Sequence, residues 1–557
     1  MSTVLKRGIT WVVALCVLSL PLAARVARAE SPAPEPLIVM SVASTDRMLG
    51  DIGDLMEATG AGDIGRLLVL MTAPYTAALE RDQPVGMYAT LREVDQMEAV
   101  GFLPVRDLQM LLRTLQDQLG TPRDAGDGVQ ELAVDQPQTV FVREQDGWAF
   151  FADRKALLMD LPAEPAALLG DLPERYTMAV RLHVPAIPAE IRQMAIQQIQ
   201  QGFEEAMQDQ LTDDLQVEFG RLAYQSQIDT IATLMDDAES LTVGWRIASE
   251  DRCLQIEVAL QALEGSTVAH ELSRIAGGTP TDFAGLLHPD AAAAILMTAP
   301  ALDADVQQSL AIGALVRNQV LQGIQDDPNL SEPDRAEATQ IMHALTELGE
   351  QTIRAAKNDT GACLILKPDS IAVVAGGYIS DGEKLAGIVQ RLHALAQRLE
   401  PRTPDVHFNA EVYQGVTMHT TAIPLRDADA QARQLLGDPL DVVIGTGARS
   451  VYLAFGQDAA GVLKAVVDAS TEQNVPPVQA FLALESILEF AASVDDNPIL
   501  RDVLDAVKQS EGGDRIRVAV VPVERGVAFQ LSVDQAVGAA VGQGVRLLAP
   551  LVQDLIP

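Results

Sequence analysis

Apolar and polar residues along the chain follow one recurring local order: two strand-like segments joined by a polar turn, and then an amphipathic helix. The second strand of each pair is rich in β-branched or aromatic residues, as in Trp148–Phe151 and Val451–Phe455, and such residues favour strands. Strands joined by short polar turns pair as antiparallel hairpins. We find this order in five segments, namely Thr139–Leu161, Leu241–Ile275, Ala362–Leu392, Val442–Val467 and Arg515–Leu548.

Longer helices are predicted between these hairpins. Apolar residues recur every three to four positions from Ala189 to Leu211, which is typical of an amphipathic helix. Its predicted partner is Phe219–Ala238. A second helical pair is predicted at Asp303–Ile324 and Pro333–Ala356, and a third helical stretch between Pro477 and Val507.

We therefore predict an α+β fold of repeated antiparallel β-hairpin plus helix modules with inserted helical pairs. The order of strand, helical pair, hairpin and helix begins near Met178, again near Ala293, and in altered form near Val442. Duplication of a module of about a hundred residues would produce this order, and chance spacing in a mixed chain is the alternative. The predicted divisions are a signal peptide at residues 1–29 and four modules at residues 30–175, 176–288, 289–440 and 441–557.

Two junctions between a strand and a helix carry similar residues. Ser380 is followed three positions later by Glu383, and Ser532 by Gln535. This spacing is typical of a capping box, in which the serine and the later residue satisfy backbone amides at the start of a helix.

The N-terminus carries a targeting pattern. Lys6 and Arg7 precede an apolar run over residues 9–22, and Ala27-Arg28-Ala29 forms a small-x-small cleavage sequence. This arrangement predicts a cleavable secretory signal peptide. We therefore expect the mature protein to be periplasmic or extracellular.

Cysteine usage leaves two alternatives open. Cys16 lies in the predicted signal peptide, so Cys253 and Cys363 remain, both in apolar strand-like segments. An oxidising compartment permits a disulfide between them. Cysteine is also a common small residue of hydrophobic cores.

The chain is strongly acidic, with 77 Asp and Glu against 40 Lys and Arg and a net charge of −37. Such a surface repels nucleic acid and anionic lipid headgroups. Calcium binding would use the acids, but Asp427-Ala-Asp429 lacks the glycine and distal glutamate of a calcium loop, and Asp124–Glu131 matches no known repeat. Acidic pairs on solvated helix faces are the simpler interpretation.

No transmembrane segment is expected after signal removal, because no run of about 18 apolar residues follows. The C-terminal segment comes nearest, with the small-residue spacing of Gly538 and Gly542. Asp534, Gln543 and Arg546 interrupt it. Close packing of a helix on a sheet is the expected reason for these glycines.

Catalytic motifs are missing from the sequence. No two of the seven histidines have a metal-ligand spacing on one helix. His407 and His419 lie near the ends of a predicted hairpin and would meet across it, but without a third ligand we interpret them as surface residues. Gly445-Thr446-Gly447 lacks the third glycine of a phosphate loop and precedes a strand, so it is interpreted as a hairpin turn.

Aromatic residues make up only 4% of the chain, which argues against stacking on sugars or bases. The mature chain keeps two tryptophans, Trp148 and Trp245, each flanked by apolar residues. Packing in a core is the expected role of both.

Three short segments carry a resemblance to other proteins. They are Ile187–Met194, its continuation Gly202–Glu205, and Leu241–Ile247. With their surroundings from Pro173 to His288, they resemble large uncharacterised exported proteins of planctomycete-type bacteria. The resemblance implies no catalytic residue, cofactor or substrate.

We accordingly predict an exported, soluble, acidic cell-envelope protein with no catalytic, cofactor or metal site. Its expected role is to bind a protein partner or a hydrophobic ligand between sheets and paired helices. The alternative is an envelope hydrolase whose active site is assembled from distant paired carboxylates.

Overall fold

The computed structural model describes residues 36–553, except for 94–95, 136–137, 211–227, 229–230, 249–252, 276–278, 302 and 472. The predicted signal peptide and most of the predicted helix Phe219–Ala238 lie outside the described residues. The chain forms two compact units. Unit 1 comprises Met1–Gln198 and Leu234–Leu263, and unit 2 comprises Ile199–Thr233 and Glu264–Pro557. The four modules predicted from the sequence are a finer division and stay a prediction.

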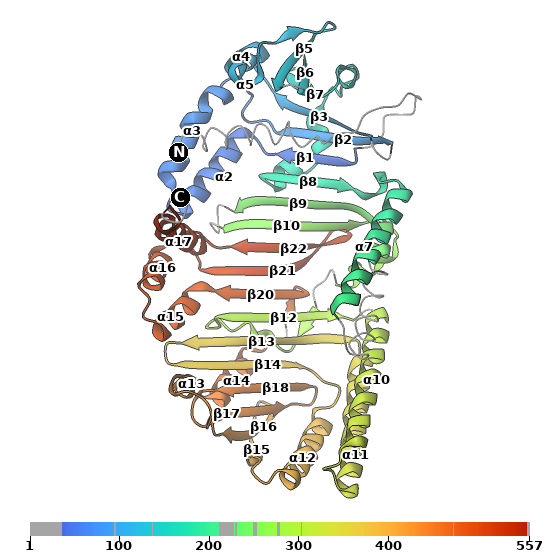
Figure 1. Ribbon diagram of the computed structural model, residues 1–557, viewed down its shortest axis with the longest axis vertical. Helices are drawn as coiled ribbons and strands as arrows, with labels where there is room; N and C mark the ends of the chain where they lie inside the picture. Colours follow the sequence, from blue (N-terminus) through green and yellow to red (C-terminus); the bar gives the residue numbers. More distant parts are fainter. Residues whose placement is uncertain are drawn as a thin grey trace. The chain divides into compact units, whose positions relative to one another are not determined.

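Unit 1 contains a sheet whose described strands pair only in antiparallel fashion, in the order β4–β5–β6–β7–β3–β2–β1–β8–β9–β10 (Figure 1). The strands are β1 (Ile38–Val42), β2 (Val85–Glu93), β3 (Gln96–Pro104), β4 (Arg123–Asp124), β5 (Val129–Asp135), β6 (Gln138–Gln145), β7 (Trp148–Ala152), β8 (Met178–His183), β9 (Ala238–Ala248) and β10 (Cys253–Ala262).

The helices of unit 1 follow the strands in a regular way. A helical pair joins β1 to β2, α7 follows β8, and helical residues 231–237 precede β9. The helices are α2 (Thr45–Ala58), α3 (Gly62–Thr76), α4 (Leu108–Thr114), α5 (Gln116–Leu119), α6 (Leu172–Arg175) and α7 (Ala189–Gln210), of which the residues up to Gln198 belong to unit 1, with short 3₁₀ helices η1 (Lys155–Leu158), η2 (Pro165–Leu169) and η3 (Val184–Ala186).

The strands of unit 2 also pair in antiparallel fashion, in the order β15–β16–β17–β18–β14–β13–β12–β20–β21–β22. Its strands are β12 (Ala293–Pro300), β13 (Lys357–Lys367), β14 (Ser370–Tyr378), β15 (Val406–Tyr413), β16 (Val416–Ile423), β17 (Leu440–Thr446), β18 (Ser450–Gly456), β20 (Val478–Ala483), β21 (Arg515–Val523) and β22 (Gly526–Val533), with the separate pair β11 (Thr279–Thr281) and β19 (Gln473–Val475).

The helices of unit 2 occupy corresponding connections. The long pair α10 and α11 joins β12 to β13, and the pair α15 and α16 joins β20 to β21. The helices are α9 (Thr267–Ile275), η4 (Ala284–Leu286), α10 (Asp303–Asp326), α11 (Glu332–Arg354), α12 (Gly382–Leu399), α13 (Ala430–Leu436), α14 (Ala459–Ala469), α15 (Leu484–Val494), α16 (Pro498–Gln509) and α17 (Gln535–Gln553).

The two units share one topology. In each, a first strand is followed by a helical pair, a hairpin, two further hairpins, a strand with its own helical segment, and a last hairpin followed by a helix. The central contact also corresponds, because β1 pairs with β8 in unit 1 and β12 pairs with β20 in unit 2. The repeated element of this chain is therefore the whole ten-stranded unit.

The α+β fold and its hairpins confirm the prediction. Four hairpin-plus-helix segments appear as expected, and the helical pair at α10 and α11 matches its predicted bounds closely. The segment Thr139–Leu161 differs, because its hairpin is followed by the 3₁₀ helix η1. The stretch Pro477–Val507 also differs, because it begins with the strand β20 before α15.

Both predicted capping boxes are wrong by one or two positions. Asp381 caps α12, with its Oδ1 accepting a hydrogen bond from Lys384 N at 2.9 Å, while Ser380 N donates to Thr352 Oγ1. Ser532 lies within β22, and α17 starts at Gln535 after the buried Asp534. An aspartate caps a helix as well as a serine does, so Asp381 takes the position at α12. The Asp534 carboxylate instead accepts from Arg515 N and from Arg517.

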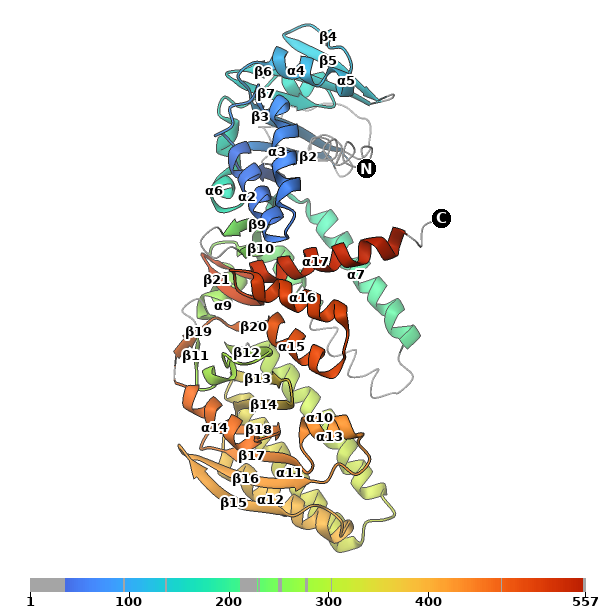
Figure 2. The ribbon, with the colours of Figure 1, turned by 90° about the vertical axis from the view of Figure 1, so that its left-hand side faces the viewer.

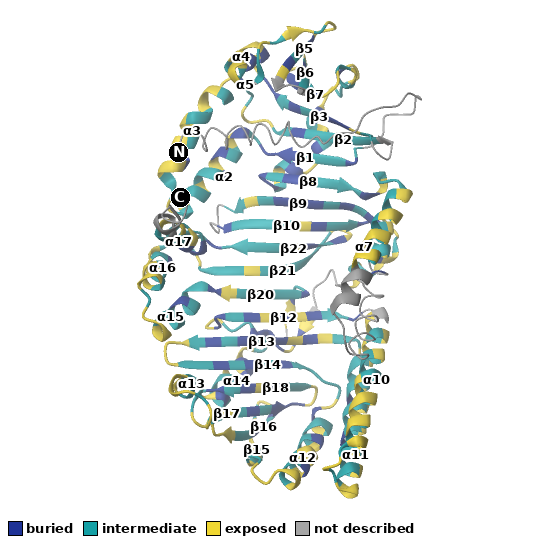
Figure 3. Ribbon diagram, viewed as in Figure 1, coloured by how far each residue is buried: buried dark blue, intermediate teal, exposed yellow. Residues whose placement is uncertain are grey.

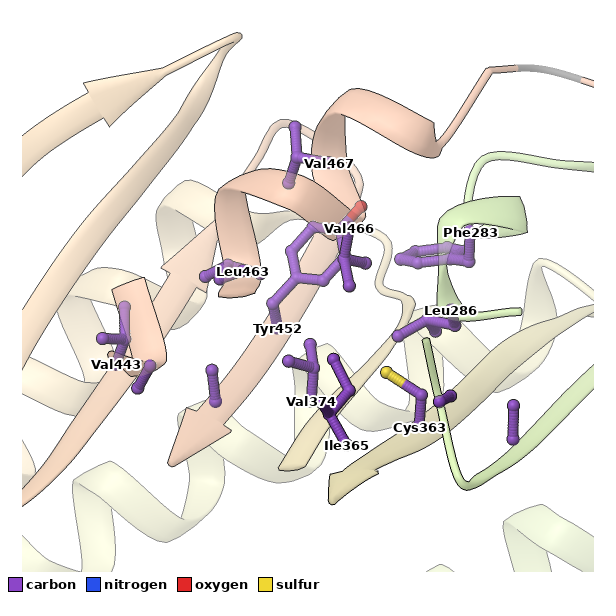
Figure 4. Packing of buried hydrophobic residues seen from close by; sticks show 14 of the residues in the cluster. Phe283, Leu286, Cys363, Ile365, Val374, Val443, Tyr452, Leu463, Val466 and Val467 are labelled. Carbon is purple, nitrogen blue, oxygen red and sulfur yellow. The ribbon is translucent and has the colours of Figure 1, made fainter. Parts of the chain in front are cut away.

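The main core of unit 2 lies on one side of its sheet, which we call the closed face (Figure 4). Leu463 and Val466 of α14 pack there against Tyr452, Val374 and Cys363. Gly376 leaves room for the Tyr452 ring in this core, because a Cβ at residue 376 would lie 2.6 Å from Cδ1 of Tyr452. Cys253 and Cys363 are both buried and form no disulfide with each other.

Candidate functional site

One face of unit 1 presents only apolar side chains on four neighbouring strands. Residues directly opposite each other in antiparallel strands point to the same side of a sheet, so the register defines rows across it. We call this set the apolar face of unit 1. Its three rows are Ile38, Leu182, Leu241 and Leu260; Met40, Val180, Val243 and Val258; and Val42, Met178, Trp245 and Ile256.

Unit 2 presents the same arrangement on the equivalent strands β12, β20, β21 and β22. No polar or charged residue interrupts the rows, which we call the apolar face of unit 2. They are Ala293, Leu482, Ile516 and Val533; Ile295, Ala480, Val518 and Leu531; and Met297, Val478, Val520 and Phe529.

Both apolar faces are open to solvent (Figure 3). Of the residues in the six rows only Val42 is buried. Seven have exposed fractions between 36% and 47%, namely Val180, Val243, Val258, Ile295, Met297, Leu482 and Phe529. Contiguous exposed apolar surface on a protein marks a place where another molecule binds.

Charged residues that lie between the rows on these strands point to the opposite side. In unit 1, Glu257 binds Arg175 at 2.8 Å and accepts a hydrogen bond from Tyr176, while Arg181 binds Asp171 at 2.7 Å. In unit 2, Arg517 forms a bidentate pair with Asp534, at 2.6 and 2.8 Å. The absence of charge from the rows is thus a property of one face and not of the strands as a whole.

Helices border the apolar face of unit 2. Figures 1 and 2 show α10 and α11 at one end of its strands and α15 and α16 at the other end, on the side opposite α14. Each group has its own core: Ile341 and Leu348 of α11 pack on α12, and Leu488 of α15 packs with Val507 of α16. The bordering helices are therefore internally stabilised and do not need the sheet to bury their apolar residues.

A pocket of about 450 Å³ adjoins this apolar face. Met297 of the apolar face pairs with Thr360 of β13, and Thr360 lines the pocket. Apolar lining comes from Ala375, Val451 and Leu453 of the sheet, together with Ala301 and Val306. Polar lining comes from Asp305 and Ser309 of α10, Thr352 of α11, Lys357, Asn358, Asp359 and Thr360 of β13, and the rings of Tyr378 and Tyr452.

The cation in the lining of this pocket is paired with two carboxylates. Lys357 Nζ lies 3.2 Å from Asp359 Oδ2 and 3.4 Å from Asp282 Oδ2, and 5.3 Å from the centre of the Tyr378 ring. Burial opposes the charge, but the two carboxylates outweigh it and raise the pKa of Lys357. Asp359 is buried and also accepts from Thr281 Oγ1 at 2.6 Å. These contacts pair the ammonium group with carboxylates of the protein itself.

A second pocket, of about 670 Å³, lies beside β15, β16 and β17. Its lining mixes both signs of charge, with Arg402 and Arg426 beside Asp405, Asp441 and Asp458. Asp458 is occupied as the cap of α14, where its Oδ1 accepts from Gly461 N. This pocket has no polarity that selects one class of ligand.

The histidines considered from the sequence do not come together. His407 is exposed and pairs with Thr420 of the neighbouring strand. His419 is the residue before Thr420, so its side chain points to the other face of the sheet. His419 is buried: its Nδ1 accepts from Asn409 N at 3.1 Å and its Nε2 lies 3.2 Å from Thr446 Oγ1. Desolvation lowers its pKa. The interpretation of His419 as a surface residue is wrong.

The remaining candidates have structural roles. Gly447 closes the turn between β17 and β18, with its N donating to Ser450 O, which confirms the hairpin turn. Asp429 caps α13, and Asp127 pairs with Lys155. Trp148 lies in a core, whereas Trp245 is half-buried on the apolar face. Across the described part of the chain, no group of three or more His, Cys, Asp or Glu is placed to hold a metal ion.

Within the same described residues, none of the helices has the length and apolar character needed to cross a membrane. Searches against protein-family models, curated proteins and solved structures give no match to this chain.

The apolar faces were missed by sequence reasoning, although a signal was present. Along β9, Leu241, Val243 and Trp245 alternate with Thr242 and Gly244. Such alternation predicts a strand with one buried side, so the apolar side is assigned to an interior. Only the exposure of these side chains in the folded chain identifies the side as open.

Proposed function

We propose that this exported protein binds lipid-like molecules by laying their acyl chains on its two apolar faces. One observation carries the proposal: equivalent strands in both units present three uninterrupted apolar rows that remain open to solvent. The predicted signal peptide supports a role outside the cytoplasm. No reactive group is required for such binding.

The dimensions of each face suit an acyl chain. Four strands about 4.8 Å apart, and three rows two residues apart, give a floor of roughly 15 Å by 15 Å. One leaflet of a bilayer contributes about 15 Å of hydrocarbon. A chain of about fourteen carbons gains roughly 0.8 kcal/mol per buried methylene, on the order of 10 kcal/mol before the costs of association.

The bordering helices favour a chain molecule over a flat partner. The second sheet of a dimer would have to fit between α10 and α15 to reach the apolar face of unit 2, whereas a single acyl chain would not. The negative net charge of the protein repels lipids with strongly anionic headgroups, so binding of these lipids is disfavoured.

Trp245 provides a direct test, because it lies on the apolar face of unit 1. Titration with a monoacylglycerol whose chain carries bromine should quench the tryptophan fluorescence of the mature protein. Trp245→Phe should remove most of this quenching, because Trp148 is buried in a core. Val243→Asp should weaken binding by at least about tenfold, since it places a charge in the middle row.

The matched control is Val412→Asp, at a 66% exposed position of β15 outside both faces. It should leave binding unchanged. The proposal is wrong if the bromine-substituted chain does not quench Trp245, or if sedimentation shows that the chain dimerises and Val243→Asp only dissolves the dimer.

A further inference from the structure

The pocket beside the apolar face of unit 2 is suited to the polar end of a bound amphiphile. We propose that it selects uncharged, hydroxyl-bearing headgroups, such as glycerol, over carboxylate or phosphate headgroups. This inference rests on the proposed function, because it assigns the headgroup of the molecule whose chain lies on the apolar face.

Continuity between chain and headgroup sites is given by the register. The row that contains Phe529, Val520, Val478 and Met297 continues through Thr360 to Gly377 and Val451. Thr360, Gly377 and Val451 all line the pocket. An acyl chain along this row therefore ends beside the polar side chains, where its headgroup would lie.

The polar lining matches hydroxyl groups. Ser309 and Thr352 bring hydroxyls, Asn358 brings an amide that both donates and accepts, and Asp305 brings acceptors. Thr360 donates its own proton to Gly376 O, which leaves its oxygen as an acceptor for a headgroup hydroxyl, whereas Thr352 donates to Leu348 O and already accepts from Ser380 N. A glycerol hydroxyl satisfies either type of partner.

The charge of the lining disfavours anions. Asp305 is the acid of the lining on α10, and the Lys357 ammonium is held by Asp282 and Asp359. A carboxylate headgroup would thus meet a negative side chain without a cation available to neutralise it. Asp359 is paired with Lys357, and the exposed Asp305 gives only weak attraction for a cation, so hydrogen bonding decides the preference.

The test compares three probes with the same fourteen-carbon chain: monomyristoylglycerol, myristate and myristyltrimethylammonium. We expect the wild-type protein to bind the monoacylglycerol at least tenfold more tightly than myristate, and more tightly than the ammonium probe. Asn358→Leu should reduce the preference for the monoacylglycerol to about threefold or less. Asp305→Asn should strengthen myristate binding several-fold, because it removes the negative charge, and so narrow the preference for the monoacylglycerol.

Asn318→Leu is the matched control, at an exposed position of α10 outside the pocket lining. It should keep the wild-type preference. Equal binding of all three probes, or tightest binding of the ammonium or the carboxylate, would overturn the headgroup inference and leave chain binding intact. Failure of every probe to bind would instead contradict the proposed function.

Discussion

At β12 and β14 the two faces of the unit 2 sheet are both apolar, yet only one is covered. On the closed face, Leu296 and Val374 are fully buried beneath α14 and η4. On the apolar face, their neighbours in the sequence point the other way, and Ile295 is 40% exposed. The difference shows that apolar composition in this sheet serves two purposes: one face holds the fold together, and the other is available to a ligand.

The adjacent residues Leu296 and Ile295 give the largest contrast. Leu296→Asp should destabilise unit 2 by more than about 4 kcal/mol or prevent folding, since it buries an unpaired charge. Ile295→Asp should cost about 1 kcal/mol or less, because a charge there is hydrated. Urea unfolding of both variants measures the difference. Similar losses in both would show that the apolar face is covered.

Thiol labelling sharpens the comparison. Burial on the closed face raises the pKa of Cys363 to about 11, so its thiolate is scarce at pH 8. Leu453→Cys introduces a thiol at a 43% exposed position. At pH 8 this thiol should react about a hundredfold faster than Cys363, because each pKa unit changes the thiolate fraction about tenfold.

Peptide mapping by mass spectrometry distinguishes the two thiols. Raising the pH from 8 to 10 should accelerate Cys363 further, whereas the introduced thiol should approach its limit above about pH 8.5. Rapid labelling of Cys363 at pH 8 in the native protein would contradict the closed face.

Gly376 and Gly377 provide the smallest contrast. Gly376→Ala places a Cβ 2.6 Å from the Tyr452 ring and should cost about 1–3 kcal/mol by overpacking. Gly377→Ala places its Cβ 3.0 Å from Thr360 Oγ1, which can rotate on the open side. It should change stability by less than about 1 kcal/mol. Thermal unfolding of both variants tests this, and equal losses would remove the distinction between the faces.

The two units differ in how their closed faces are covered, but not in their open apolar rows. Unit 2 covers its closed face with the eleven-residue helix α14, whereas the equivalent hairpin of unit 1 is followed by the four-residue η1. The closed-face cover thus differs between two copies of one topology. The open apolar rows occur in both.

Hairpins and long helices were predictable because their signals are local. Alternating residues around short turns identified β13 with β14 and β21 with β22, and the apolar period identified α10 and α11. The strand β20 was assigned to a helix because Val478, Phe481 and Leu482 also fit a helical period. Its strand conformation depends on pairing with β12 and β21, which are distant in the sequence.

The candidate site was not predictable for a related physical reason. In β12, Ile295 and Leu296 are both apolar, so the sequence does not show which side is covered. Coverage depends on α14, more than 160 residues later in the chain. The pocket likewise requires α10, β13 and β18 to meet.

The pairing of β12 with β20 joins two strands of unit 2 that are far apart in the sequence. Its contact order is therefore high, and such topologies fold slowly because long loops must close first. During vectorial synthesis, β12 remains an unprotected edge until Val478–Ala483 has emerged. Nascent chains of this protein thus pass through an aggregation-prone stage that the finished sheet eliminates.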